Sequence, residues 1–272
     1  MNAAAPIGVF DSGVGGLSVL RALRAALPAE DFVYLADSAH APYGERDDAF
    51  VAARAMAMAA QLHADHGIKA LVVACNTATA AAMVALRDAW PAMPLVGVEP
   101  ALKPAAARTR TGAVGVMATR STLASRKFAA LHASLAGQAR FFLQPCDGLA
   151  DAIEQQDATK IIALCAEYTR ALGRFGSTPG AVDTLVLGCT HYPFAADVLR
   201  GLASPVRVKM LKVELMETGE PVARQTGRLL AAAGLQAARA SGGLTLRSTG
   251  SPAALDALRA SAARWLPQPV QA

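Results

Sequence analysis

Two cysteines occupy matching positions in this 272-residue chain, each at the end of a short apolar run. Cys75 ends the run LVVAC and precedes asparagine and threonine, whereas Cys189 ends the run LVLGC and precedes threonine and histidine. Such runs are typical of buried parallel strands, and the turn from a strand into a helix exposes backbone N–H groups and the positive end of the helix dipole. Both features favour a thiolate over a thiol. The pair therefore predicts a site with two acid/base thiols.

A buried cysteine is most often a small packing residue. That interpretation suffices for Cys165, which lies among apolar residues of a predicted helix, and Cys146 in a strand-end loop is given no role. It explains the matched pair poorly, because polar residues follow both Cys75 and Cys189 after similar strands.

A glycine-rich turn, DSGVGG at residues 11–16, follows the first predicted strand and opens a helix. Its backbone amides could hold an anionic group. It is not a dinucleotide-binding fingerprint, because Ser18 stands where the third glycine would be. Asp11, at the end of the strand, could orient an ammonium group or accept a proton.

Two further segments carry side chains suited to a ligand. His191 follows Cys189 by two residues and could donate a proton or orient the thiol. The turn at residues 41–44 could offer the Tyr43 hydroxyl and the Gly44 N–H to a ligand, although by default it is only a loop. The other four histidines are interpreted as structural or surface residues: His40, His63, His66 and His132.

The pattern of strands and helices is that of an α/β protein with an internal repeat. Strands rich in valine, isoleucine and leucine alternate with alanine-rich helices, which predicts parallel sheets covered by helices. The run at residues 7–12 is echoed at 114–119, and in both halves it precedes the cysteine run. We expect two similar parallel-sheet domains related by pseudo-twofold symmetry, with the active site between them. The first comprises residues 1–98 and 209–272, and the second comprises residues 99–208.

Local signals delimit several helices. The helix from Asp48 to Ala64 has acidic residues at its start and Gly67 just past its end. Thr77 is predicted to cap the helix that follows Cys75, and Ser251 to cap the last helix.

Composition and charge exclude several classes of function. The net charge of +5 is spread along the chain without basic clusters interleaved with aromatics, so we expect no nucleic-acid partner. No apolar run approaches the roughly 18 residues of a membrane span, and no secretory signal opens the sequence, so we expect a cytoplasmic protein without a membrane partner. Four cysteines without a C-x-x-C pair favour neither a disulfide framework nor a metal site.

The motifs together carry a family resemblance. The chain resembles the glutamate racemases, the cofactor-independent branch of the aspartate/glutamate racemase superfamily. The matching segments are FDSGVGG at 10–16, APYG at 41–44, ACNTA at 74–78 and GCTHYP at 188–193.

The resemblance implies a chemical role for both thiols. Cys75 and Cys189 would flank the substrate α-carbon, one taking a proton as thiolate and the other returning a proton as thiol. Asp11 would assist Cys75, and His191 would assist Cys189. The implied reaction converts L-glutamate to D-glutamate for peptidoglycan synthesis, with no cofactor and no metal, in a homodimer.

The resemblance also implies the residues that bind glutamate: Asp11, Ser12, Tyr43, Gly44, Asn76, Thr77, Thr190 and His191. Asp37 and Glu154 lie at positions similar to further acids of the family.

Two bases answer a stereochemical requirement. A single base that returns a proton to the side it came from regenerates the starting enantiomer, whereas two groups on opposite faces allow inversion. Oriented hydrogen-bond donors would stabilise the carbanion in place of a pyridoxal cofactor, for which no lysine stands in a recognisable setting.

Three alternatives stay open at this stage. Cys189 and His191 could act as nucleophile and base of an amidohydrolase or acyl transferase. The substrate could be aspartate in place of glutamate. The chain could also be a two-lobed amino-acid-binding module without catalysis, which explains the repeat but not the paired thiols.

Overall fold

The structure, a computed structural model, describes residues 2–203 and 213–266. It confirms two sets of parallel strands with α-helices. The described chain divides into two compact units, the first formed by Met1–Val98 and Gly219–Ala272 and the second by Glu99–Thr218. Residue 209, the predicted start of the returning segment, lies outside the described residues. No helix among the described residues is both long and apolar enough to cross a bilayer.

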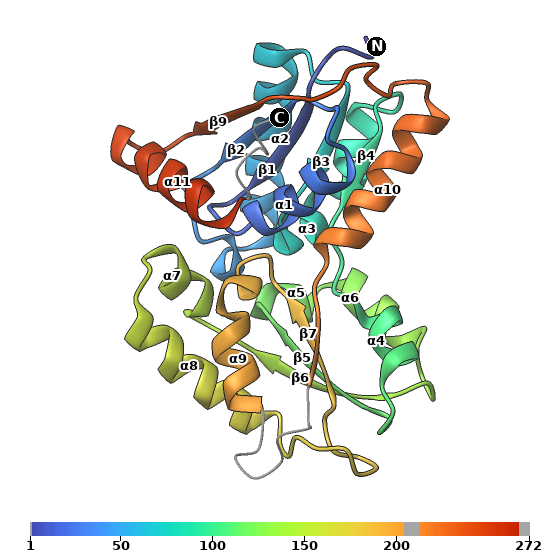
Figure 1. Cartoon of the computed structure of the whole chain (residues 1–272), viewed down its shortest axis with the longest axis vertical. Helices are drawn as coiled ribbons and strands as arrows, with labels where there is room; N and C mark the ends of the chain where they lie inside the picture. The colour runs from blue at the N-terminus through green and yellow to red at the C-terminus, as the bar shows by residue number, and fades with distance from the viewer. Residues whose placement is uncertain (1, 204–212, 267–272) are drawn as a thin grey trace. The chain divides into compact units, whose positions relative to one another are not determined.

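The first unit is built on a five-stranded parallel sheet in the order β4-β3-β1-β2-β9. Its strands are β1 (Ile7–Asp11), β2 (Phe32–Ala36), β3 (Ala70–Val73), β4 (Leu95–Gly97) and β9 (Leu244–Ser248). Its helices are α1 (Leu17–Ala26), α2 (Asp48–His66), α3 (Asn76–Ala89), α10 (Gly219–Ala232) and α11 (Pro252–Trp265), with a 3-10 turn η1 (Tyr43–Glu45). In Figure 1 this unit runs from blue to teal, and the orange α10 and red α11 complete it.

The second unit has a four-stranded parallel sheet in the order β6-β5-β7-β8. Its strands are β5 (Ala113–Ala118), β6 (Arg140–Pro145), β7 (Thr184–Gly188) and β8 (Glu214–Met216). Its helices are α4 (Leu102–Arg108), α5 (Arg120–Ala124), α6 (Arg126–Ala133), α7 (Leu149–Glu154), α8 (Ala158–Ala171) and α9 (Ala196–Ala203), with a 3-10 turn η2 (Tyr192–Ala195).

The two sheets repeat one topology. If β5, β6, β7 and β8 are matched to β1, β2, β3 and β4, both sheets have the same strand order, and β9 extends only the first. In each sheet the chain leaves the first strand in one direction and returns on its other side, so the switch point lies between β1 and β3 and between β5 and β7. Open α/β sheets bind ligands at the carboxyl ends of the strands at this point. The topology therefore indicates where each unit carries its functional residues.

Side-chain alternation explains why both faces of the second sheet are covered. In β7, Leu185 and Leu187 join one buried cluster with residues of α7, α8 and α9. Val186 points to the opposite face and joins a second cluster with Leu102 of α4 and Phe128 of α6. A strand buried on both faces reads as the continuous apolar run seen in the sequence.

The predicted start and stop signals of α2 and α11 are present in the structure. Asp47 caps α2 by accepting a hydrogen bond from the Phe50 N–H at 2.7 Å, and Gly67 ends it in the left-handed conformation with φ of 56°. Ser251 caps α11 by accepting from the Ala254 N–H at 3.3 Å. The short helices α4 to α7 were not predicted.

Gly188, the last residue of β7, cannot be enlarged without a backbone shift. A Cβ there would lie 2.9 Å from the carbonyl oxygen of Met117 and 2.9 Å from the Cβ of Ala118 on the paired strand. Strand β7 therefore approaches β5 closely just before Cys189.

We expect Gly188→Ala to lower the free energy of unfolding by about 1–3 kcal/mol, because the added methyl overpacks this contact. Chemical denaturation monitored by circular dichroism measures the change. The matched control is Gly201→Ala in α9, where a Cβ meets no atom within 4 Å; it should raise stability by roughly 0.5–1 kcal/mol. Equal effects from the two substitutions would contradict this account of Gly188.

Candidate functional site

Strands β1 and β3 bring Asp11 and Cys75 to one edge of the first sheet. Asp11 ends β1 and is fully buried, and Cys75 follows β3 by two residues. The N–H of Ala74 donates to the carbonyl of Phe10 at 2.8 Å, which continues the pairing of the two strands up to the thiol. A Cβ on Gly16 would lie 2.8 Å from the Asp11 Cβ and 3.1 Å from the Ala74 Cβ. The start of α1 therefore packs directly on this edge, and it can do so only with glycine.

Cys75 itself is the N-cap of α3. Its backbone is extended, and its Sγ accepts a hydrogen bond from the N–H of Ala78 at 3.4 Å. The prediction that Thr77 caps this helix was wrong: the helix begins at Asn76, and Thr77 lies within the first turn. A cap acceptor faces unpaired N–H groups at the positive end of the helix, and these favour negative charge on the sulfur.

The side-chain amide of Asn76 is buried and has no hydrogen-bond partner among the residues that the structure describes. Only 4% of it is exposed, and within the described structure neither its side-chain nitrogen nor its oxygen has a partner. Leaving a buried polar group unsatisfied costs about 1–3 kcal/mol, so such a group calls for an explanation. Thr77, which follows Asn76, and Ser12, which follows β1, are buried as well. A ligand bound here would satisfy the hydrogen-bonding groups of the Asn76 amide.

The second unit carries Cys189 in a chain of three groups. Cys189 follows β7, and its Sγ lies 3.7 Å from Nδ1 of His191. The other ring nitrogen of His191, Nε2, lies 2.7 Å from Oε1 of Glu154 at the end of α7. Thr190, between the cysteine and the histidine, is buried. Glu154 therefore fixes the orientation of the imidazole toward the sulfur.

His191 is held in its charged form. Burial alone lowers its pKa, but the hydrogen bonds with Cys189 and Glu154 and the negative charge of Glu154 outweigh burial and raise the pKa well above its ordinary value. An imidazolium beside a sulfur can stabilise a thiolate or relay a proton. The two units thus support their thiols differently, one with a helix N-terminus and a nearby carboxyl group, the other with a histidine and a carboxylate.

The remaining cysteines are suited to packing. Burial raises the pKa of Cys165 to about 11, and burial followed by the charge of Cys189 raises that of Cys146 as well. Both stay protonated at neutral pH. No group of three or more histidine, cysteine, aspartate or glutamate side chains in the described ranges could hold a metal ion.

Tyr43 lies in η1 and is buried, and its hydroxyl donates to Oδ2 of Asp37 at 2.5 Å. Its proton is therefore engaged within the protein. Burial, then the hydrogen bond with Asp37, raise the Tyr43 pKa far above its ordinary value. The Tyr43 side chain belongs to the same buried cluster as Cys75.

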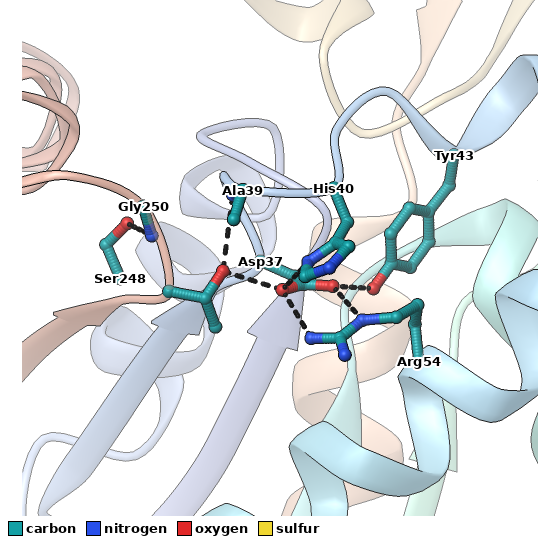
Figure 2. Close-up of polar contacts among 8 residues, drawn as sticks. Asp37, Ala39, His40, Tyr43, Arg54, Ser248 and Gly250 are labelled. Carbon is teal, nitrogen blue, oxygen red and sulfur yellow. Dashed lines mark hydrogen bonds and ion pairs between the residues drawn. The ribbon is translucent and has the colours of Figure 1, made fainter.

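Asp37 binds two residues that the sequence reasoning missed: Arg54, which is labelled in Figure 2, and Thr249. One signal was available for Arg54: it is the only aspartate, glutamate, lysine or arginine between Asp48 and Asp65 in an apolar helix. A lone charge in such a setting needs a partner. Thr249 carried no comparable signal.

Comparisons with known proteins show the family to which the chain belongs. The family model described as Asp/Glu/Hydantoin racemase matches residues 7–220. A glutamate racemase from Ralstonia pickettii is 48% identical over 262 residues, covering 96% of this chain and 88% of the relative. One from Ectopseudomonas mendocina is 51% identical over 229 residues, covering 83% of this chain and 82% of the relative.

Solved structures show the same likeness. A glutamate racemase from Bacillus anthracis superimposes with a TM-score of 0.82 at 29% identity, covering 97% of this chain and 94% of the other. The Escherichia coli glutamate racemase, solved with L-glutamate and the activator UDP-MurNAc-Ala, gives a TM-score of 0.80 at 30% identity, covering 96% of this chain and 95% of the other. The chain therefore belongs to the Asp/Glu/hydantoin racemase family, in its glutamate racemase branch.

Proposed function

We propose that this racemase interconverts L- and D-glutamate without a cofactor, with Cys75 and Cys189 as its two acid/base groups. The observation that carries the proposal is the repeated topology, in which an equivalent strand of each unit ends next to a cysteine. Glutamate as substrate is supported by relatives named glutamate racemase at 48% identity. By family analogy the product serves peptidoglycan synthesis, in a cytoplasmic homodimer.

The chemistry is a proton transfer in two steps. The Cys75 thiolate takes the proton from the α-carbon and becomes a thiol, which leaves a carbanion. The Cys189 thiol gives its proton to the opposite face of that carbon and becomes a thiolate. The reverse reaction exchanges the two roles. The mechanism requires the two sulfurs to address opposite faces of one α-carbon.

The neighbours of each thiol have distinct tasks in this proposal. Asp11 assists Cys75, while His191, oriented by Glu154, assists Cys189. The unpartnered amide of Asn76 and the N-terminus of α3 would hold substrate polar groups, and donors fixed in place stabilise the developing carbanion without reorganisation. Ser12, Tyr43, Gly44, Thr77 and Thr190 complete the proposed binding set.

One alternative keeps a specific observation in its favour. The chain Cys189–His191–Glu154 has the order of a nucleophile, a base and an orienting acid. A hydrolase built on it would not need Cys75.

Single-cysteine variants separate the two activities. We expect Cys75→Ser and Cys189→Ser each to lower racemisation of L- or D-glutamate by roughly 10²–10⁴-fold, the contribution of a positioned acid/base group. Circular dichroism of the amino acid follows the reaction, and aspartate is run in parallel. Cys165→Ala is the control and should retain activity. A Cys75→Ser enzyme with full racemase activity would refute the proposal, and hydrolysis of amides by that variant would favour the alternative.

The Glu154–His191 pair predicts a pH dependence. Because Glu154 helps to raise the His191 pKa, the imidazolium persists above its ordinary pKa of 6.5 and is lost only as pH rises through the higher value. In Glu154→Gln that proton is lost at lower pH, so the alkaline limb of kcat should move to lower pH. Asp151→Asn, which removes a surface ion pair from the same helix, should leave the profile in place. An unchanged limb in Glu154→Gln would contradict this role.

A further inference from the structure

Asp37 is a carboxylate with every oxygen engaged. It follows β2 and is fully buried. Arg54 of α2 binds it through two hydrogen bonds of 2.9 Å, from Nε to Oδ2 and from Nη2 to Oδ1. Thr249 donates its hydroxyl to Oδ1 at 2.6 Å, and Nδ1 of His40 lies 3.0 Å from the same oxygen. With the Tyr43 hydroxyl, these groups surround the carboxylate (Figure 2).

The surroundings of Asp37 favour its ionised form. Burial alone raises the Asp37 pKa, but hydrogen bonds led by those from Arg54 and Thr249 outweigh it and lower the pKa to about 2. The carboxylate is therefore ionised at neutral pH. Asp37 lies at a position similar to that of an acid of the family. Here it acts as an anchor, a fixed charge that binds Arg54 and Thr249.

The anchor joins segments that are distant in sequence. Arg54 comes from α2, and Thr249 comes from the loop after β9, 212 residues beyond Asp37. Thr249 also accepts a hydrogen bond from the N–H of Ala39 at 3.2 Å. The loop from Asp37 to Tyr43 is thus held at its start by Thr249 and at its end through the Tyr43 hydroxyl.

This loop reaches the Cys75 half of the proposed site through Tyr43. The tyrosine ring and Cys75 belong to one buried cluster together with Phe10 and Ala78. Negative charge on Cys75 is also among the causes that raise the Tyr43 pKa, after burial and Asp37. The position of the ring in the cluster that contains Cys75 therefore depends on the groups that fix Asp37.

We propose that Arg54 and Thr249 are positioning residues of the Cys75 half-site, which act through Asp37 to hold Tyr43 in the buried cluster that contains the thiol. The inference rests on the proposed two-thiol function. It assigns a role to an α2 arginine and to a residue of the C-terminal segment that no motif marks.

The kinetic test uses Arg54→Gln and Thr249→Val in the full-length enzyme, with Thr249→Ser to restore the hydroxyl. Misplacing a reacting group by about an ångström costs on the order of 10²-fold, so we expect kcat to fall roughly 10- to 100-fold in Arg54→Gln and less in Thr249→Val. Thr249→Ser should recover most of the loss. Arg259→Gln, which breaks a surface pair with Asp256, is the matched control and should behave as wild type.

Isotope effects distinguish positioning from general damage. With α-deuterated L- and D-glutamate, the isotope effect in Arg54→Gln should rise only in the direction in which Cys75 removes the proton. In Glu154→Gln, which perturbs Cys189, it should rise in the opposite direction. Two results would overturn the inference. One is an equal decrease of kcat in both directions without a change in isotope effects, and the other is wild-type kinetics in Arg54→Gln. Wild-type enzyme that does not racemise glutamate would instead refute the proposed function.

Acid unfolding shows independently whether a variant releases Asp37. The Asp37 pKa falls from 3.8 to about 2 on folding. The ionised carboxylate therefore stabilises the folded state above pH 3.8, and this contribution is lost as pH falls toward 2. Arg54→Gln should raise the folded-state pKa and move this loss to higher pH. Thermal unfolding at a series of acidic pH values, with Arg259→Gln beside it, measures the shift. If the unfolding temperature of Arg54→Gln depended on acidic pH as that of the wild type does, the proposed anchoring of Asp37 by Arg54 would be contradicted.

Discussion

The hydrogen bond from the Ala78 N–H to the Cys75 sulfur is the interaction on which the account depends. It exists because β3 ends two residues before the thiol and α3 begins one residue after it. The sulfur therefore occupies the position where a helix most favours negative charge. A parallel strand leading into a helix supplies this environment through backbone N–H groups.

The two units share a strand order, but the side chains next to their cysteines differ. Asp11 ends β1, whereas the matching strand β5 ends at Ala118, which cannot assist a thiol. In the second unit the polar groups next to the cysteine sulfur are His191 and, through it, Glu154 at the end of α7. The repeated topology thus accounts for two equivalent sulfur positions, whereas the partners of the two sulfurs differ between the units.

The sequence predicted what depends on local pattern. The alternation of strands and helices, the repeat, and the stop of α2 at Gly67 all follow from periodicity and turn chemistry, and the structure confirms them. It did not predict the cap of α3, because cysteine is a rare cap and Thr77 has the ordinary preference. Nor could it pair Asp37 with Thr249, since 212 residues separate them and only the return of β9 to the first sheet joins them.

The central claim is that two thiols act in turn on one α-carbon, and the initial distribution of solvent label tests it most directly. L-glutamate is converted in deuterated water without added cofactor, and both enantiomers are separated early in the reaction. Two bases predict deuterium at the α-carbon of the D-product while the remaining L-substrate still carries hydrogen. Early deuterium in the L-substrate at a rate equal to or above that in the D-product would show one base exchanging its proton on one face, and would contradict the account.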